Sequence, residues 1–176
     1  MYSLLLFLHS TVRWLVVATL VISLIRAYLG IRQPRPFTRA DNAFRHWTAT
    51  VAHIQLMLGL WIYSESPIAM YFLKNARMGF QKIDLTFFGL IHPLLMFIAV
   101  VLVTIGSALA KRKVTDHDKF KTMFFWFALT LLVIFIAIPW PFSPLSTRPL
   151  SRSPLQLEPR RQRAASDRLP RGCAGR

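Results

Sequence analysis

Four long apolar stretches constrain the fold of this chain more than any other feature of its sequence. They run from about residue 3 to 29, 43 to 63, 85 to 110 and 120 to 138. Each is close to the ~20 residues that an α-helix needs to cross the hydrocarbon core of a bilayer. Inside that core every backbone polar group must be satisfied within its own segment, so each stretch is expected to be helical. The sequence therefore predicts an all-α fold, an integral membrane four-helix bundle, over residues 1–142.

The charged residues support a bilayer as the surroundings of these helices. They make up 16% of the chain, against about 25% in soluble domains. The net charge of +15 comes from 22 Lys and Arg that lie mainly in loops and in the last 34 residues. Because they do not line one amphipathic face, nucleic acid is not an expected partner. The single cysteine, Cys173, excludes a disulfide within the chain.

Residues 143–176 have a different composition from the rest. They contain eight Arg and five Pro, but only two acidic residues, Glu158 and Asp167. This composition is typical of a disordered tail. We favour a poorly constrained extension over a lipid-binding segment, and we base no function on it.

The loops before the second and fourth stretches share a helix-start pattern. In both, a Thr is followed three residues later by an acid: Thr38 with Asp41, and Thr115 with Asp118. This spacing predicts a capping box. The run from Asp116 to Asp118, with a histidine between the two acids, resembles a metal site, but a solvated helix cap explains it better.

The distribution of Lys and Arg predicts the orientation. Loops 30–42 and 111–119 and their flanks are rich in cations, whereas the longer connection between the second and third stretches is poorer. Short basic loops stay in the cytoplasm, so both termini are expected outside. The first stretch lacks a basic leader and a small-residue cleavage site, which indicates a retained helix rather than a signal peptide.

Four ionisable residues lie at membrane depth, well inside the ends of the apolar stretches, and are therefore functional candidates: His9, Arg13, His53 and His92. His9 and Arg13 are one helical turn apart and share a face. His9 and His92 lie at roughly 9 and 10 Å from the same membrane surface, at 1.5 Å per residue. Two imidazoles at matched depth on different helices could be the axial ligands, and so the metal-binding residues, of one haem b.

His53 lies nearer mid-membrane, approached from the opposite side. It could pair with His92 instead of His9, bind a quinone oxygen or pass a proton. Pro93 follows His92 and leaves the carbonyl of Gly89 without its usual helical donor. Small residues on the His92 face, such as Gly106, would let a macrocycle or a neighbouring helix approach closely.

Several short motifs occur along the membrane part of the chain. They are Leu8-His9-Ser10 with Arg13-Trp14, Pro36-Phe37-Thr38 with Asp41-Asn42, His53-Ile54-Gln55-Leu56 with Gly59-Leu60 and Tyr63, His92-Pro93-Leu94-Leu95-Met96 with Ile98-Ala99 and Thr104-Ile105-Gly106, and Ile138-Pro139-Trp140-Pro141. Together they resemble a family of small four-helix membrane proteins of Bacteroidetes-type bacteria commonly labelled "cytochrome B". The resemblance covers about residues 4 to 141. It implies haem b, electron transfer and the bacterial inner membrane, and it carries over to His9, Arg13, His53 and His92.

Three functions stay open at this point. The first is a b-type cytochrome, an electron carrier or subunit rather than a stand-alone enzyme, with one haem and a quinone or a membrane protein as partner. The second is a cofactor-free accessory or scaffold subunit of a membrane complex, and the third is a proton or solute pathway using His53 and Arg13. Imidazole nitrogens about 4 Å apart, as metal–nitrogen bonds of about 2 Å on each side require, would favour the first. Imidazoles directed at backbone carbonyls would favour the second.

Overall fold

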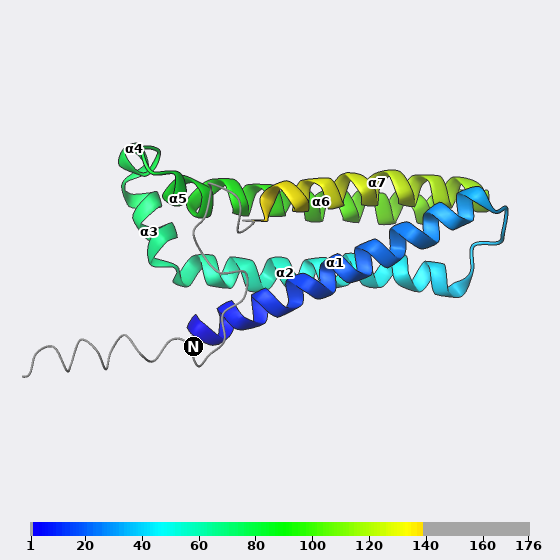
Figure 1. Cartoon of the computed structure of the whole chain (residues 1–176), viewed down its shortest axis with the longest axis horizontal. Coiled ribbons are helices and arrows are strands. Elements are labelled where there is room, and N and C mark those ends of the chain that lie inside the picture. The colour runs from blue at the N-terminus through cyan, green and yellow to red at the C-terminus, as the bar shows by residue number, and fades with distance from the viewer. Residues whose placement is uncertain (1, 139–176) are drawn as a thin grey trace, which may run out of the picture.

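The computed structural model of the chain describes residues 2–138, and every regular element in that range is helical. The predicted disordered tail, residues 143–176, and the predicted domain end at residue 142 lie outside the described residues. The elements in chain order are α1 (Tyr2–Arg32), α2 (Arg39–Glu65), α3 (Pro67–Lys74), α4 (Ala76–Gly79), α5 (Ile83–Thr86), the π-helical turn η1 (Phe87–Ile91), α6 (His92–Arg112) and α7 (Asp116–Ala137) (Figure 1).

Three helical segments are long and apolar enough to cross a membrane: Tyr2–Arg32, the continuous Ile83–Arg112, and Asp116–Ala137. The helix α2 qualifies only together with α3, from which it is bent by 65°. The first half of α2 carries Asp41 and Arg45, whose charges lower its hydropathy. Three of the four predicted stretches are thus helices with the length and apolar character that a membrane span needs, and the second meets this criterion only when α2 and α3 are taken together.

The four long helices are arranged around a common centre. The helix α1 packs against α2 and α7, and α6 packs against the same two helices. Consequently α1 and α6 face each other across the centre. The most buried side chains include Leu20, Val103, Phe120, Met123 and Phe127.

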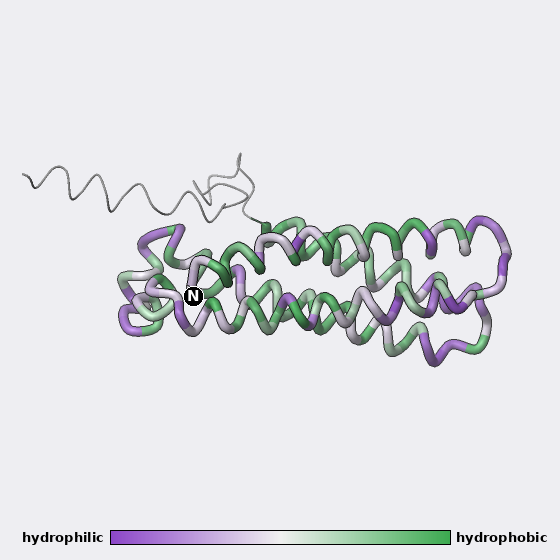
Figure 2. The backbone as a smooth tube through the Cα atoms, turned by 90° about the horizontal axis from the view of Figure 1, so that it is seen from below, coloured by the Kyte–Doolittle hydropathy of each residue, from purple (hydrophilic) through white to green (hydrophobic). Residues whose placement is uncertain are grey.

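The outward faces of these helices are also apolar. Exposed large residues occur along α1, α6 and α7, among them Leu15, Ile25, Phe97, Phe125 and Phe135. Figure 2 shows hydrophilic residues concentrated at the two ends of the molecule. An apolar outer surface between two polar ends is the arrangement that a bilayer requires.

The two basic loops lie together at one end of the molecule, opposite the N-terminus and α3–α5 (Figure 1). The ring of Phe37, in the α1–α2 loop, lies 4.9 Å from the ring of Phe120 at the start of α7. Lys119 also lies over the Phe37 ring, 5.8 Å from its centre. The loops are therefore on one side, as their charge predicts, whereas the side of the membrane that they face stays a prediction.

The predicted capping box at α2 is present in full. The Thr38 side chain accepts from the backbone N–H of Asp41, and the Asp41 side chain accepts from the backbone N–H of Thr38. At α7 the Thr115 hydroxyl accepts from the backbone N–H of Asp118 and donates to the Asp118 carboxylate at 2.7 Å. Asp116 forms an ion pair with Lys119 at 2.8 Å, in keeping with a helix cap.

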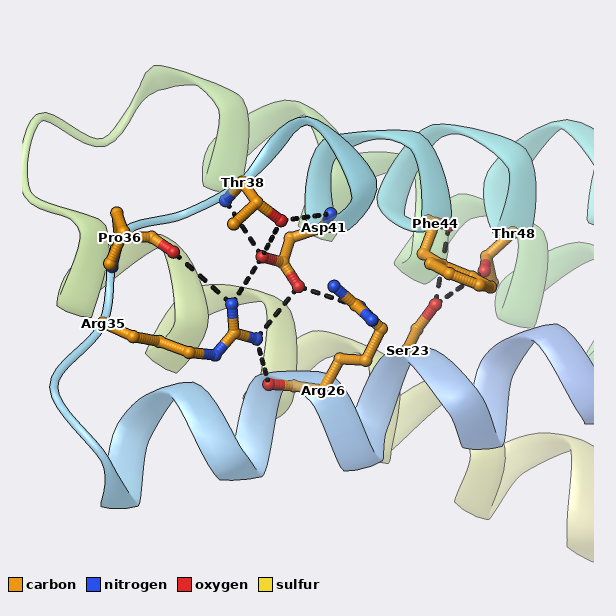
Figure 3. Close-up of polar contacts among 8 residues, drawn as sticks. All are labelled: Ser23, Arg26, Arg35, Pro36, Thr38, Asp41, Phe44 and Thr48. Carbon is orange, nitrogen blue, oxygen red and sulfur yellow. Dashed lines mark hydrogen bonds and ion pairs between the residues drawn. The ribbon is translucent and has the colours of Figure 1, made fainter.

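Asp41 is also the centre of an ion cluster that joins α1, α2 and their loop (Figure 3). Its carboxylate accepts from Arg26 Nε at 2.9 Å and from an Arg35 guanidinium nitrogen at 2.7 Å. Burial acts to raise the pKa of the Asp41 carboxyl, but the hydrogen bonds from Arg35 and Thr38 and the charge of Arg26 lower it. The net result is a pKa well below its usual range, so this carboxylate stays charged.

A second buried charge, a cation, links α2 to α6. The Arg45 side chain is only 5% exposed, and its guanidinium donates to the Ser107 carbonyl at 2.7 Å and to the Ser107 hydroxyl. It also donates to the Asn42 side-chain oxygen from two nitrogens. These partners are neutral oxygens, which satisfy the guanidinium hydrogen bonds while leaving its charge in place.

Candidate functional site

A central cavity of about 230 Å³ lies between α1, α2, α6 and α7. Most of its lining is apolar, including Leu6, Val16, Met96 and Ile134. A few polar side chains line it as well: His9, Arg13, Thr48, Gln55, Tyr63, Ser66, His92 and Thr130. An apolar cavity with a small number of convergent polar groups is the usual form of a ligand site.

His9 and His92 reach this cavity from opposite helices. His9 is on α1 and His92 is the first residue of α6, and these are the two helices that face each other across the centre. Arg13, one turn from His9 on α1, lines the same cavity. Three of the four ionisable residues singled out in the sequence are therefore gathered around one cavity.

His92 is held in a defined orientation by α7. Its Nδ1 lies 2.9 Å from the carbonyl oxygen of Ala137. A carbonyl only accepts hydrogen bonds, so Nδ1 carries a proton, and in the neutral imidazole Nε2 then keeps its lone pair. This is the form in which a histidine ligates a metal, with its second nitrogen oriented by a backbone carbonyl.

His9 lacks such a partner at Nδ1. This atom is buried and has no hydrogen-bond partner among the residues that the structure describes. The same edge of the ring lies over Gly59 of α2: a Cβ built at Gly59 would be 3.3 Å from His9 Cε1 and 3.8 Å from Nδ1. The absence of a side chain at residue 59 thus makes room for the His9 ring.

His53 does not line the cavity. Its side chain is exposed on the outer side of α2, where Nδ1 lies 2.7 Å from the Ala49 carbonyl and Nε2 lies 3.3 Å from the Thr104 hydroxyl of α6. The Thr104 contact joins α2 to α6, whereas the Ala49 carbonyl lies one turn earlier on α2 itself. No contact in the described part of the chain brings His53 to His92 as the alternative haem ligand.

Two further residues belong to the site but were not among the predicted ones. Gln55 Nε2 donates to the His9 carbonyl at 2.9 Å, while its Oε1 is buried without a partner in the described range. The Tyr63 hydroxyl donates to the Gly89 carbonyl at 2.8 Å, the carbonyl that Pro93 was expected to leave without a donor. That orphaned acceptor was a sequence signal for a partner hydroxyl, although it did not say which residue would supply it.

The cavity residues fit axial ligation of a haem by chemistry, with one restriction on space. The donor set consists of two imidazoles on facing helices, one already oriented through Nδ1. The volume of about 230 Å³ is below the ~300–1,000 Å³ typical of pockets for drug-sized ligands. Binding a macrocycle therefore requires α1 and α6 to move apart or the apolar lining to rearrange.

No protein-family model, curated protein or solved structure matches this chain. The geometry of the cavity and the short motifs of the sequence are then the grounds for a function. No group of three or more His, Cys, Asp or Glu suited to a metal ion occurs in residues 2–138.

Proposed function

We propose that this protein is a four-helix membrane bundle that holds one haem b between α1 and α6, with His9 and His92 as axial ligands. The observation that supports this proposal is that the two imidazoles line one central cavity from facing helices. Paired histidines on facing helices of a bundle are a common way to hold a cofactor. Arg13, one turn from His9 and on the same cavity, would neutralise a propionate.

When bound, haem b supplies one-electron oxidation and reduction. The protein side of the site then has three tasks. His92 presents Nε2 because its Nδ1 proton is held by Ala137, the apolar lining excludes water, and the Arg13 charge adjusts the local potential. Hydrogen bonding, burial and charge are the means by which a protein tunes haem potential.

The same proposal includes the location of the protein, its orientation in the membrane and its electron-transfer partner. The protein would lie in the cytoplasmic membrane of a bacterium, with loops 30–42 and 111–119 in the cytoplasm. It would exchange electrons with a quinone or with a membrane protein partner, as an electron carrier or subunit. The apolar outer faces of α1, α6 and α7 and the basic loops at one end support the membrane part of this proposal.

The test is a reduced-minus-oxidised spectrum of protein purified in mild detergent after expression with added haem. We expect the α-band of a low-spin haem b, abolished in His9→Ala and in His92→Ala. Retained helicity in circular dichroism shows that each variant is folded. A featureless spectrum from folded protein expressed with ample haem would overturn the proposal.

His53→Ala is the matched control. It removes another membrane-depth histidine, but one that binds Ala49 and Thr104 outside the cavity. We expect it to keep the full haem spectrum. Loss of haem in His53→Ala together with retention in His9→Ala would instead favour the pair of His53 and His92.

A cofactor-free scaffold subunit is the second candidate, and one observation favours it. The His92 imidazole binds the Ala137 carbonyl of α7, and the His53 imidazole contacts the Thr104 hydroxyl of α6. Histidines with this role tie helices together without a cofactor. This candidate predicts colourless, folded protein that co-purifies with a membrane complex, and it makes no use of the unpaired His9 nitrogen.

A further inference from the structure

Two buried polar atoms without partners line the same cavity, and they are complementary. They are Nδ1 of His9 and Oε1 of Gln55, and they are the buried side-chain atoms that lack a hydrogen-bond partner in the described residues. An amide oxygen only accepts hydrogen bonds, whereas Nδ1 of a neutral histidine donates or accepts according to the tautomer. One protonation state of His9 therefore satisfies both atoms.

The surrounding contacts bring Gln55 to the correct side of the His9 ring. The Gln55 amide nitrogen is bound to the backbone carbonyl of His9 at 2.9 Å, so the whole carboxamide is held next to this residue. Gly59 is one helical turn further along α2 and on the same face as Gln55. Since the Cε1–Nδ1 edge of His9 lies over Gly59, that edge faces the side of α2 that carries Gln55.

Leaving both atoms unpaired is costly. A buried donor or acceptor without a partner destabilises a protein by about 1–3 kcal/mol. The two atoms form no direct hydrogen bond with each other, and a cavity of about 230 Å³ has room for a bridging water, which needs two or more polar partners. A rotation of the carboxamide or one such water would complete the pair.

We infer that Gln55 is the positioning residue of His9: its Oε1 accepts the Nδ1 proton, directly or through one water, and so keeps the His9 Nε2 unprotonated towards the cavity. Gln55 would then do for His9 what the Ala137 carbonyl does for His92. Both histidines would present Nε2 to the space between α1 and α6. The role of this arrangement in ligation rests on the proposed function, but the tautomer itself does not.

The experiment therefore measures the tautomer in haem-free protein. Nitrogen-15 NMR of histidine-labelled protein in detergent distinguishes protonation at Nδ1 from protonation at Nε2, and His9→Asn identifies the His9 signals. We expect His9 to be protonated at Nδ1 in the wild type and to shift towards Nε2 protonation in Gln55→Leu. A wild-type His9 protonated at Nε2, or no change in Gln55→Leu, would overturn the inference.

Gln55→Glu separates the role of the oxygen from that of the amide nitrogen. It retains an acceptor oxygen but replaces the nitrogen that binds the His9 carbonyl. We expect it to keep the wild-type tautomer. If Gln55→Glu behaves like Gln55→Leu, Gln55 acts through the backbone contact alone and the inference is wrong.

A second measurement applies once haem is bound. A hydrogen bond at Nδ1 raises the basicity of a ligating histidine, which favours ferric iron. Gln55→Leu is therefore expected to raise the reduction potential, while His53→Ala leaves it unchanged. A haem-free protein with the expected tautomer would refute the proposed function alone, and a haem protein in which Gln55→Leu alters neither tautomer nor potential would refute the inference alone.

Discussion

At the scale of single residues, three of the four ionisable residues singled out in the sequence line the cavity, and the fourth, His53 on α2, does not. Gln55, two positions later, lines the cavity instead. Side chains two positions apart on an α-helix point about 200° away from each other. Whether residue 53 or residue 55 lines the cavity therefore depends on which face of α2 turns inward. Soluble helices reveal this face by their polar outer side. Here the outer side is apolar too, with Ile54, Met57 and Leu60 exposed. The spacing of apolar residues therefore does not indicate which face of α2 turns inward.

The cluster around Asp41 gives a prediction at the same scale. Asp41→Asn is expected to lower the free energy of unfolding by roughly 1.5–3 kcal/mol at neutral pH, because the variant loses charged hydrogen bonds with Arg26 and Arg35. The pKa of Asp41 is lowered in the folded protein, so the wild-type carboxylate contributes fully above its unfolded pKa of about 3.9. The contribution is lost as pH falls below that value towards the folded pKa.

The measurement is denaturant unfolding in detergent, followed by circular dichroism across this pH range. The difference between wild type and Asp41→Asn should be constant above about pH 5 and shrink below about pH 4. Glu65→Gln, at an exposed position at the end of α2, is the control and should change little. A difference that is independent of pH would show that the ion pairs do not stabilise the protein.

At the scale of elements, the sequence located the long helices to within a few residues and missed what interrupts them. Capping was predictable because Thr38 and Asp41 act locally. The third stretch was expected to be one helix, but a π-helical turn, Phe87–Ile91, precedes His92 in the structure. The connection between the second and third stretches contains the short helices α3 and α4, where only a loop was expected. These features depend on contacts such as Phe72 on Gly89, which join distant parts of the chain.

The hydrogen bond between Tyr63 and Gly89 offers a test of the π-helical turn that precedes His92. Tyr63→Phe removes the hydroxyl that binds the Gly89 carbonyl at 2.8 Å, and Pro93 has no N–H to replace it. We expect a loss of about 1–3 kcal/mol in unfolding free energy, the cost of an unpaired buried acceptor. Combining Tyr63→Phe with Pro93→Ala should cost less than the sum of the two changes, since alanine restores a donor. If the two changes in unfolding free energy are strictly additive, the Tyr63 hydroxyl does not compensate for the donor that Pro93 lacks.

The close approach of α6 and α7 gives a second prediction about elements. A Cβ at Gly106 would overlap with Cβ of Trp126 and lie 2.9 Å from its Cγ. Gly106→Ala is therefore expected to destabilise the protein by about 1–3 kcal/mol, the usual cost of overpacking. Ala108→Leu, which enlarges an exposed position on the same helix, serves as the control. Both are measured by thermal unfolding in detergent, and equal stability of Gly106→Ala and the wild type would contradict this packing.

At the scale of the whole molecule, charge and apolar length predicted that both basic loops share one end, and the contact of Phe37 with Phe120 agrees. The central cavity could not be predicted from the sequence, because its volume depends on how the four long helices pack against one another. The sequence could state only that His9 and His92 have similar depth.

The orientation of the molecule can be tested by labelling single cysteines with an impermeant maleimide, in a background in which Cys173 is replaced by serine. Asn75→Cys, between α3 and α4, should react in intact spheroplasts. Lys113→Cys, in the α6–α7 loop, should react only after the membrane is permeabilised, because short basic loops remain in the cytoplasm. The reverse pattern would invert the predicted orientation.

The buried Arg45 implies an order in which the helices insert into the membrane during synthesis. Its acceptors on Ser107 lie 62 residues further along the chain, so α2 leaves the ribosome before its partner on α6 exists. Burying an arginine in a membrane without acceptors is unfavourable, and α2 alone is the least apolar of the four long helices. A nascent chain that ends before Ser107 would therefore hold α2 at the membrane surface, and the arrival of α6 would complete its insertion.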